Sequence, residues 1–172
     1  PAQPDREGFS RAFVELCWRQ APRNHLRKYA GWVLDYAAEF AVDPFLVAAV
    51  VYRFSRCRQK GKADFGIGLG RVNHRMHARH IGKDRTYRYH VLKGGQWEAR
   101  ALPLKRWRFL PYHLRRPEPN LYFTAALLRV AQDQCPHNDG VFGSVPHRHF
   151  VSHFAWGDQV KGAGAEDRTL RA

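Results

Sequence analysis

The feature that most constrains the fold is an uninterrupted apolar run, residues 45–51, that stands directly behind an aspartate and a proline. Asp43 suits the N-cap of a helix, and Pro44 suits the first turn, where a backbone N–H has no partner to lose. Seven consecutive apolar residues leave no polar face for solvent, so we expect this helix to be buried on most sides. Glycines at 66, 68 and 70 follow, and glycine lets a backbone approach its neighbours closely. The chain is therefore built around a central helix and a tight turn.

Apolar residues at helical spacing predict further helices before and after this one. The expected helices lie near residues 6–19, 25–40, 44–56, 73–80, 120–134 and 147–161. Gly94 and Gly95 give a turn signal inside an aromatic and basic stretch, and the residues on either side, 88–92 and 96–102, predict a short hairpin. We expect a mainly α fold with a small hairpin insertion, in a single domain over residues 1–161 with a flexible tail over 162–172.

The order of these segments resembles the soluble lytic transglycosylases and goose-type lysozymes. In that family a buried helix ends in Glu-Ser, and a Gly-x-Gly-Leu-Met-Gln-like segment follows and lines the sugar groove. Here the helix ends in Phe54 and Ser55, and the turn reads Gly68, Leu69, Gly70 and Arg71. The resemblance implies a lysozyme-like helical domain.

Two later segments extend the resemblance. Residues 119–128 are similar to the family's Asn-Ile-x-x-Gly-x-x-Tyr-Leu helix, with Thr124 where glycine is usual. Residues 149–155 resemble the helix that leads into a Tyr-Asn-x-Gly motif, which here reads Phe154, Ala155, Trp156 and Gly157. The matching pieces keep the family order over roughly half the chain, which separates them from a chance motif.

The same comparison predicts that catalysis is lost. It places the general-acid glutamate at Phe54, and a phenyl ring has no proton to give to a leaving glycosidic oxygen. Arg71 replaces the expected glutamine, and Phe154 and Ala155 replace the tyrosine and asparagine. We expect a pseudoenzyme, with ligand contacts carried over by resemblance to Ser55, Gly68, Leu69, Arg71, Asn73 and Trp156.

Positive charge is concentrated in one part of the sequence. Residues 53–116 hold 18 Lys and Arg against three acids, Asp64, Asp84 and Glu98, so their net charge is +15. The rest of the chain has a net charge of −1, which gives +14 for the whole sequence. Clustered charge of one sign favours a polyanionic partner. A solvated basic surface with no partner is the equally weighted alternative.

Three functional hypotheses follow. The first is an inactive domain that binds peptidoglycan or another anionic glycan, or that scaffolds cell-wall or envelope proteins. The second is an active glycosidase with a different acid, for which Asp64 beside the glycine-rich turn is the first choice and Glu39 and Glu98 are the others. The third, ranked last, is a nucleic-acid-binding module.

Aromatic residues among the arginines bear on the third hypothesis. Trp97, Trp107 and Tyr112 could stack on sugar rings or bases. For each of them taken singly, however, a place in the core of the insertion is the better expectation.

The resemblance also implies a periplasmic or envelope location, although no signal peptide is visible. No apolar run reaches the length of a membrane span. Cys17, Cys57 and Cys135 have no metal or redox spacing, which leaves open one disulfide with a free thiol or three reduced cysteines. Arginines interleave the closely spaced histidines, and such neighbours disfavour a metal ion. We therefore expect no metal and no cofactor. The histidines concerned are His74, His77, His80, His149 and His153.

Overall fold

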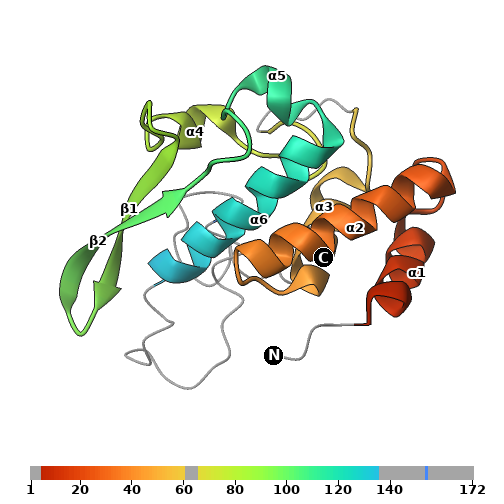
Figure 1. Cartoon of the computed structure of the whole chain (residues 1–172), viewed down its shortest axis with the longest axis horizontal. Coiled ribbons are helices and arrows are strands. Elements are labelled where there is room, and N and C mark those ends of the chain that lie inside the picture. Colours follow the sequence, from red (N-terminus) through yellow and green to blue (C-terminus); the bar gives the residue numbers. More distant parts are fainter. Residues whose placement is uncertain (1–4, 61–65, 136–153, 155–172) are drawn as a thin grey trace. The chain divides into compact units, whose positions relative to one another are not determined.

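The computed structural model describes residues 5–60, 66–135 and 154. In chain order the elements are α1 (Arg6–Cys17), α2 (Arg23–Glu39), α3 (Pro44–Ser55), α4 (His74–Ala78), β1 (Thr86–Lys93), β2 (Gln96–Pro103), α5 (Pro111–Leu114) and α6 (Pro117–Gln134). The predicted mainly helical fold with one small antiparallel hairpin is confirmed for this part of the chain (Figure 1).

Backbone contacts divide the chain into two compact units. Unit 1 comprises Pro1–His74 and Phe109–Ala125, and unit 2 comprises Arg75–Arg108 and Ala126–Ala172. Helix α6 gives its first half to unit 1 and its second half to unit 2.

Helices α1 and α3 each begin at an aspartate that caps the first turn. The Asp5 carboxylate accepts from the amides of Glu7 and Gly8, at 3.2 and 2.8 Å, and so caps α1. Asp43 caps α3 by accepting from the Phe45 amide at 2.8 Å, as the sequence predicts. The chain leaves α3 through Arg56, whose φ of 51° ends the helix in the left-handed conformation.

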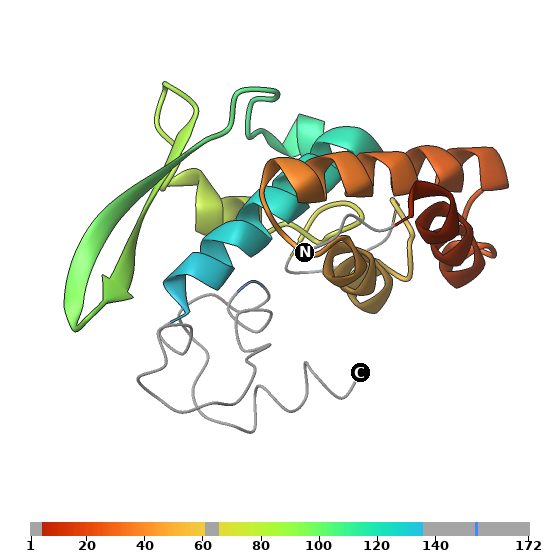
Figure 2. The same ribbon diagram turned by 60° about the horizontal axis from the view of Figure 1, so that its bottom comes forward.

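Unit 1 is held together by buried faces of its helices. Helix α1 packs on α2, and Figure 2 shows the two lying side by side. Phe9 of α1 meets Phe45 of α3 edge to face, with ring centroids 5.2 Å apart. Tyr36 of α2 packs in the same way on Tyr122 of α6, at 5.3 Å. Phe9 and Tyr36, which lie at the predicted helical spacing, are buried, whereas Phe45 is 54% exposed and covers the edge of this core.

Cys17 and Cys57 form a disulfide, and Cys135 is buried and is not disulfide-bonded. The bond joins the end of α1 to the residue that follows the α3 cap, 40 positions later in the sequence. Of the two expectations for the three cysteines, the structure has the one with a single disulfide.

Unit 2 contains the hairpin, whose strands run from the pair Thr86 and Pro103 to the pair Lys93 and Gln96 (Figure 2). Gly94 and Gly95 have φ values of 55° and 80°, as the two central residues of a tight hairpin turn require. The strands are longer than the predicted residues 88–92 and 96–102.

One side of β1 is buried, and the tyrosine hydroxyl groups on that side form hydrogen bonds. Tyr87, Tyr89 and Val91 alternate with exposed or half-buried residues along the strand. The Tyr89 hydroxyl donates to the Asp133 carboxylate of α6 at 2.7 Å. Burial of the side chain, together with this hydrogen bond, raises the pKa of Tyr89. Tyr87 shares a 2.9 Å hydrogen bond with Nδ1 of the buried His77.

The last predicted helix, residues 147–161, and the predicted tail lie outside the described residues, apart from Phe154. Phe154 is helical and buried. In the part of the chain that the structure describes, no helix has the length and apolar character needed to cross a membrane.

Candidate functional site

The end of α3 carries the residues that the resemblance aligns with Glu-Ser. Phe54 is partly buried, and Ser55 is buried with 5% of its surface exposed. The Ser55 hydroxyl donates to the Val51 carbonyl oxygen one helical turn earlier, at 2.8 Å. This hydroxyl therefore serves the helix itself, a common use of serine inside helices.

Asn120 at the start of α6 anchors the glycine-rich turn. Its side-chain oxygen accepts from the Gly70 amide at 2.8 Å, and its side-chain nitrogen donates to the carbonyls of Ile67 and Leu114 at 2.7 and 2.9 Å. Ile67 and Val72 also pair with each other across the turn. Asn120 is fully buried, so these bonds replace the water that its amide loses.

The glycines of this turn are explained by packing inside unit 1. Gly68 has a φ of 76°, a backbone conformation that residues with a side chain rarely adopt. A β-carbon on Gly70 would overlap the side chain of Thr124 on α6. Leu69 between them is 0% exposed. The close approach expected from the sequence is therefore an approach to α6. Gly68 and Leu69, both expected to touch a ligand, lie in the interior.

Arg71 does not have the exposed position expected of a ligand contact. It is 9% exposed, with a φ of 49° in the turn closed by Ile67 and Val72, and burial lowers the pKa of its guanidinium. Asn73, which directly precedes α4, is partly buried. Asp64, Ala155 and Trp156, the other residues of the predicted site, lie outside the described residues.

The remaining candidate acids have surface positions. Glu39 is exposed at the end of α2. Glu98 on β2 forms an ion pair with Arg100 at 2.9 Å. Asp84, which was not among the candidate acids, binds the Arg88 guanidinium, and this contact together with the Thr86 amide lowers the pKa of Asp84 to about 2. An acid with so low a pKa holds no proton to donate near neutral pH.

All ten lysines and arginines of residues 75–108 are exposed. We call them the basic surface of unit 2: Arg75, Arg79, Lys83, Arg85, Arg88, Lys93, Arg100, Lys105, Arg106 and Arg108. The same segment holds only two acids, Asp84 and Glu98, each in an ion pair with an arginine. The positive charge predicted from the sequence is therefore displayed to solvent.

Two aromatic residues expected in the core are instead exposed. Trp97 on β2 is 68% exposed, and Tyr112 on α5 is 64% exposed. Trp97 pairs with Leu92 rather than with Tyr87, Tyr89 or Val91, so it lies on the strand face opposite to the buried one. Trp107, in contrast, is partly buried.

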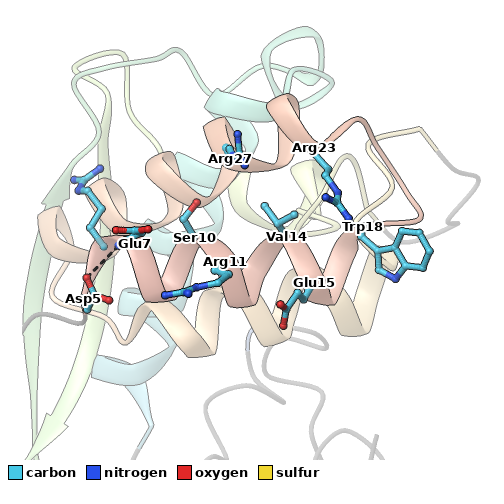
Figure 3. A pocket seen from close by; sticks show the side chains of 10 residues that line it. Asp5, Glu7, Ser10, Arg11, Val14, Glu15, Trp18, Arg23 and Arg27 are labelled. Atoms are coloured by element: carbon cyan, nitrogen blue, oxygen red, sulfur yellow. Dashed lines mark hydrogen bonds between the residues drawn. The ribbon is translucent and has the colours of Figure 1, made fainter.

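An open pocket of about 910 Å³ lies along α1 and the beginning of α2 (Figure 3). Figure 3 shows Arg11 and Glu15 of α1 on its wall, together with Trp18, which directly follows α1, and Arg23 and Arg27 of α2. Its full lining has four arginines and three acids, so the wall favours neither sign of ligand. None of the residues predicted for the site belongs to it.

Asn120 was not predicted as a site residue, although the sequence carries a signal for its role. A single amide stands at the head of the apolar stretch 121–128, all of which is buried. A buried amide must find hydrogen-bond partners, and the nearby glycine-rich turn has backbone groups to offer. The sequence carried a weaker signal for the exposure of Trp97. In a tight hairpin Trp97 pairs with Leu92, which lies on the strand face opposite to Tyr89 and Val91.

Protein-family models, curated proteins and solved structures give no significant match.

Proposed function

We propose that this protein is a non-catalytic, lytic-transglycosylase-like domain that binds an anionic glycan, with peptidoglycan as the first choice. The observation that carries the proposal is the basic surface of unit 2, in which every lysine and arginine is exposed. Peptidoglycan bears free carboxylates on its stem peptides. Exposed cations can pair with these, and arginine does so with two parallel hydrogen bonds.

The absence of catalysis rests on the residue at the end of α3. Phe54 stands where the resemblance requires a proton donor, and a glycosidic bond is not cleaved in this class without one. Glu98 and Asp84, the acids of the hairpin region, are held in ion pairs. These positions support binding without turnover.

The contact between the glycine-rich turn and α6 supports the family part of the proposal. The two segments that carry much of the resemblance are about fifty residues apart, and the Gly70–Asn120 hydrogen bond brings them together in unit 1. The lysozyme-like fold itself remains part of the proposal.

An envelope location is supported by the Cys17–Cys57 bond. Disulfides persist in oxidising compartments, such as the periplasm, and are rare in the reducing cytosol. The same compartment gives access to peptidoglycan.

The test is retention of the purified protein on intact peptidoglycan sacculi at low and moderate salt. We expect binding that weakens steeply as salt rises, because the exposed charges are screened. The matched variant replaces the exposed Lys83, Lys93 and Lys105 with glutamine, and we expect weaker binding with a smaller salt dependence. The control is Lys28→Gln, which removes the charge of an exposed lysine in unit 1.

Duplex and single-stranded DNA are the comparison ligands in the same assay. Tight DNA binding without retention on sacculi would replace the proposal with the nucleic-acid hypothesis. Retention on neither polymer would overturn glycan binding and leave protein scaffolding.

A further inference from the structure

The hairpin has one face that the described part of unit 2 leaves uncovered. Directly paired residues of antiparallel strands point to the same side, and residues two apart along a strand share that side. Tyr87, Tyr89 and Val91 therefore mark the buried face. We call the opposite one the open face, formed by Arg88, His90 and Leu92 of β1 with Trp97, Ala99 and Ala101 of β2.

The open face is a platform with a raised end. Ala99 and Ala101 are exposed and carry only methyl groups, so the middle of the face is shallow. Trp97 rises at the turn end with 68% of its surface exposed. From Trp97 to Ala101 the strand spans roughly 13 Å, longer than a single ring, so that a polymer could contact the face along its length.

Polar groups stand beside the platform on β1. His90 is exposed and lies opposite Ala99, and Arg88 lies opposite Ala101. The Asp84 carboxylate receives two hydrogen bonds from the Arg88 guanidinium, at 3.1 and 2.7 Å, which holds the arginine in place. An aromatic plane next to fixed hydrogen-bonding groups is what a sugar ring needs, because a pyranose has apolar C–H groups on its face and hydroxyls at its rim.

We propose that the open face is the glycan-contact surface of this protein, with one sugar ring stacked on the Trp97 indole and bonded to His90, and a following ring of the same polymer bonded to Arg88. The inference rests on the proposed function above and assigns it to particular residues. The basic surface around the hairpin then attracts the carboxylates of the same polymer.

The number of exposed aromatic residues favours a sugar over a nucleic-acid strand. Proteins that bind single strands stack successive bases on several aromatic platforms. In the described part of unit 2, Trp97 is exposed, whereas Tyr87 and Tyr89 are 4% and 7% exposed and cannot serve as further platforms. One platform flanked by polar groups fits one ring of a glycan.

The experiment compares three variants of the full chain for binding to sacculi and to soluble peptidoglycan fragments. Trp97→Ala should weaken binding about tenfold, by analogy with the loss of a single aromatic stacking platform. Trp97→Phe keeps a ring and should retain most of the affinity. Trp18→Ala removes a tryptophan that is 52% exposed in unit 1 and should bind like the natural sequence.

Salt separates stacking from charge attraction. Stacking involves no net charge, so the factor lost in Trp97→Ala should be the same at low and moderate salt, whereas the lysine variants lose a salt-dependent factor. Circular dichroism and thermal unfolding of each variant check that the fold is kept. If Trp97→Ala unfolds, His90→Ala on the same face carries the test, and we expect it to weaken binding.

The outcomes distinguish the two proposals. Retention of the natural sequence on sacculi with Trp97→Ala equally retained would overturn the open face as the contact surface and leave glycan binding intact. No retention of the natural sequence would overturn both. Equal weakening by Trp18→Ala would assign stacking to unit 1 and contradict the inference, and stronger loss on single-stranded DNA than on fragments would assign the face to nucleic acid.

Discussion

The side chain of Thr124 occupies the space that a β-carbon on Gly70 would fill. Both residues are buried, and their neighbours are tied together by the Asn120 hydrogen bonds. The glycine-rich turn and α6 are therefore fitted to each other at the level of single atoms.

We expect Gly70→Ala to destabilise the protein by about 1–3 kcal/mol, the cost of forcing an extra methyl group into a packed site. Thr124→Ala should restore much of the loss when it is combined with Gly70→Ala, because it removes the atoms that overlap. Gly31→Ala is the control. Gly31 lies inside α2, its nearest neighbour is 4.0 Å from a β-carbon, and alanine there should stabilise the helix by up to about 1 kcal/mol. Urea unfolding of the two single variants, the double variant and the Gly31→Ala control measures these differences. If the free-energy changes of Gly70→Ala and Thr124→Ala simply add in the double variant, the two side chains do not overlap as described.

Loss of the Cys17–Cys57 disulfide should cost about 4 kcal/mol of stability, from the chain entropy released by a loop of 40 residues. The measurement is the unfolding midpoint of Cys17→Ser/Cys57→Ser in a Cys135→Ala background, compared with that background alone. A reducing agent should lower the midpoint of the background protein only. Equal midpoints with and without the bond would show that the helices of unit 1 already fix the ends of the loop.

Stability should fall as the pH is lowered below about 6.5, because of His77. Burial, reinforced by the charges of His80 and Arg79, lowers the pKa of His77 from 6.5 to about 3. Between these values the unfolded chain binds a proton that the folded one does not, so the stabilising contribution is complete above pH 6.5 and is lost towards pH 3. The slope approaches about 1.4 kcal/mol per pH unit. His77→Phe should flatten this part of the profile, and an unchanged slope in denaturant titrations from pH 4 to 7.5 would assign the effect to other groups.

Neither the natural sequence nor Phe54→Glu should release soluble fragments from purified peptidoglycan. The substitution returns a carboxyl to the end of α3, but the Ser55 hydroxyl stays bonded to Val51 and Arg71 stays buried. Chromatography of the digest supernatant, with a muramidase as positive control, makes the measurement. Release by the natural sequence that is abolished by Asp64→Asn would establish instead the active-enzyme hypothesis.

The helices were predictable because their signals are local. The apolar spacing gives α1, and the Asp43 cap with the apolar run gives α3, each within two residues of its observed ends. Helix α6 begins three residues earlier than predicted, at Pro117. Proline is tolerated there because amides of the first turn have no partner within the helix, yet a pattern search takes it as a break.

The candidate site was less predictable because its properties depend on burial. Arg71 has the chemistry of an anion-binding residue, and only the folded turn reveals that it is 9% exposed. The reverse holds for Trp97, which has the chemistry of a core residue and is exposed. Which two of three cysteines pair is likewise set by the packing of α1 on its neighbours, because any of the pairs is compatible with the sequence.

The position of the three cysteines gives the two units separate chemical reporters. Cys135 is 3% exposed in unit 2, whereas Cys17 and Cys57 are covalently joined in unit 1. A thiol reagent can therefore label the native protein only when unit 2 opens around Cys135. The labelling rate then reports how often this local opening occurs. Proteolytic cleavage between Cys17 and Cys57 has the complementary property: the fragments stay attached until a reductant is added, so one gel run with and without reductant locates the cut in unit 1.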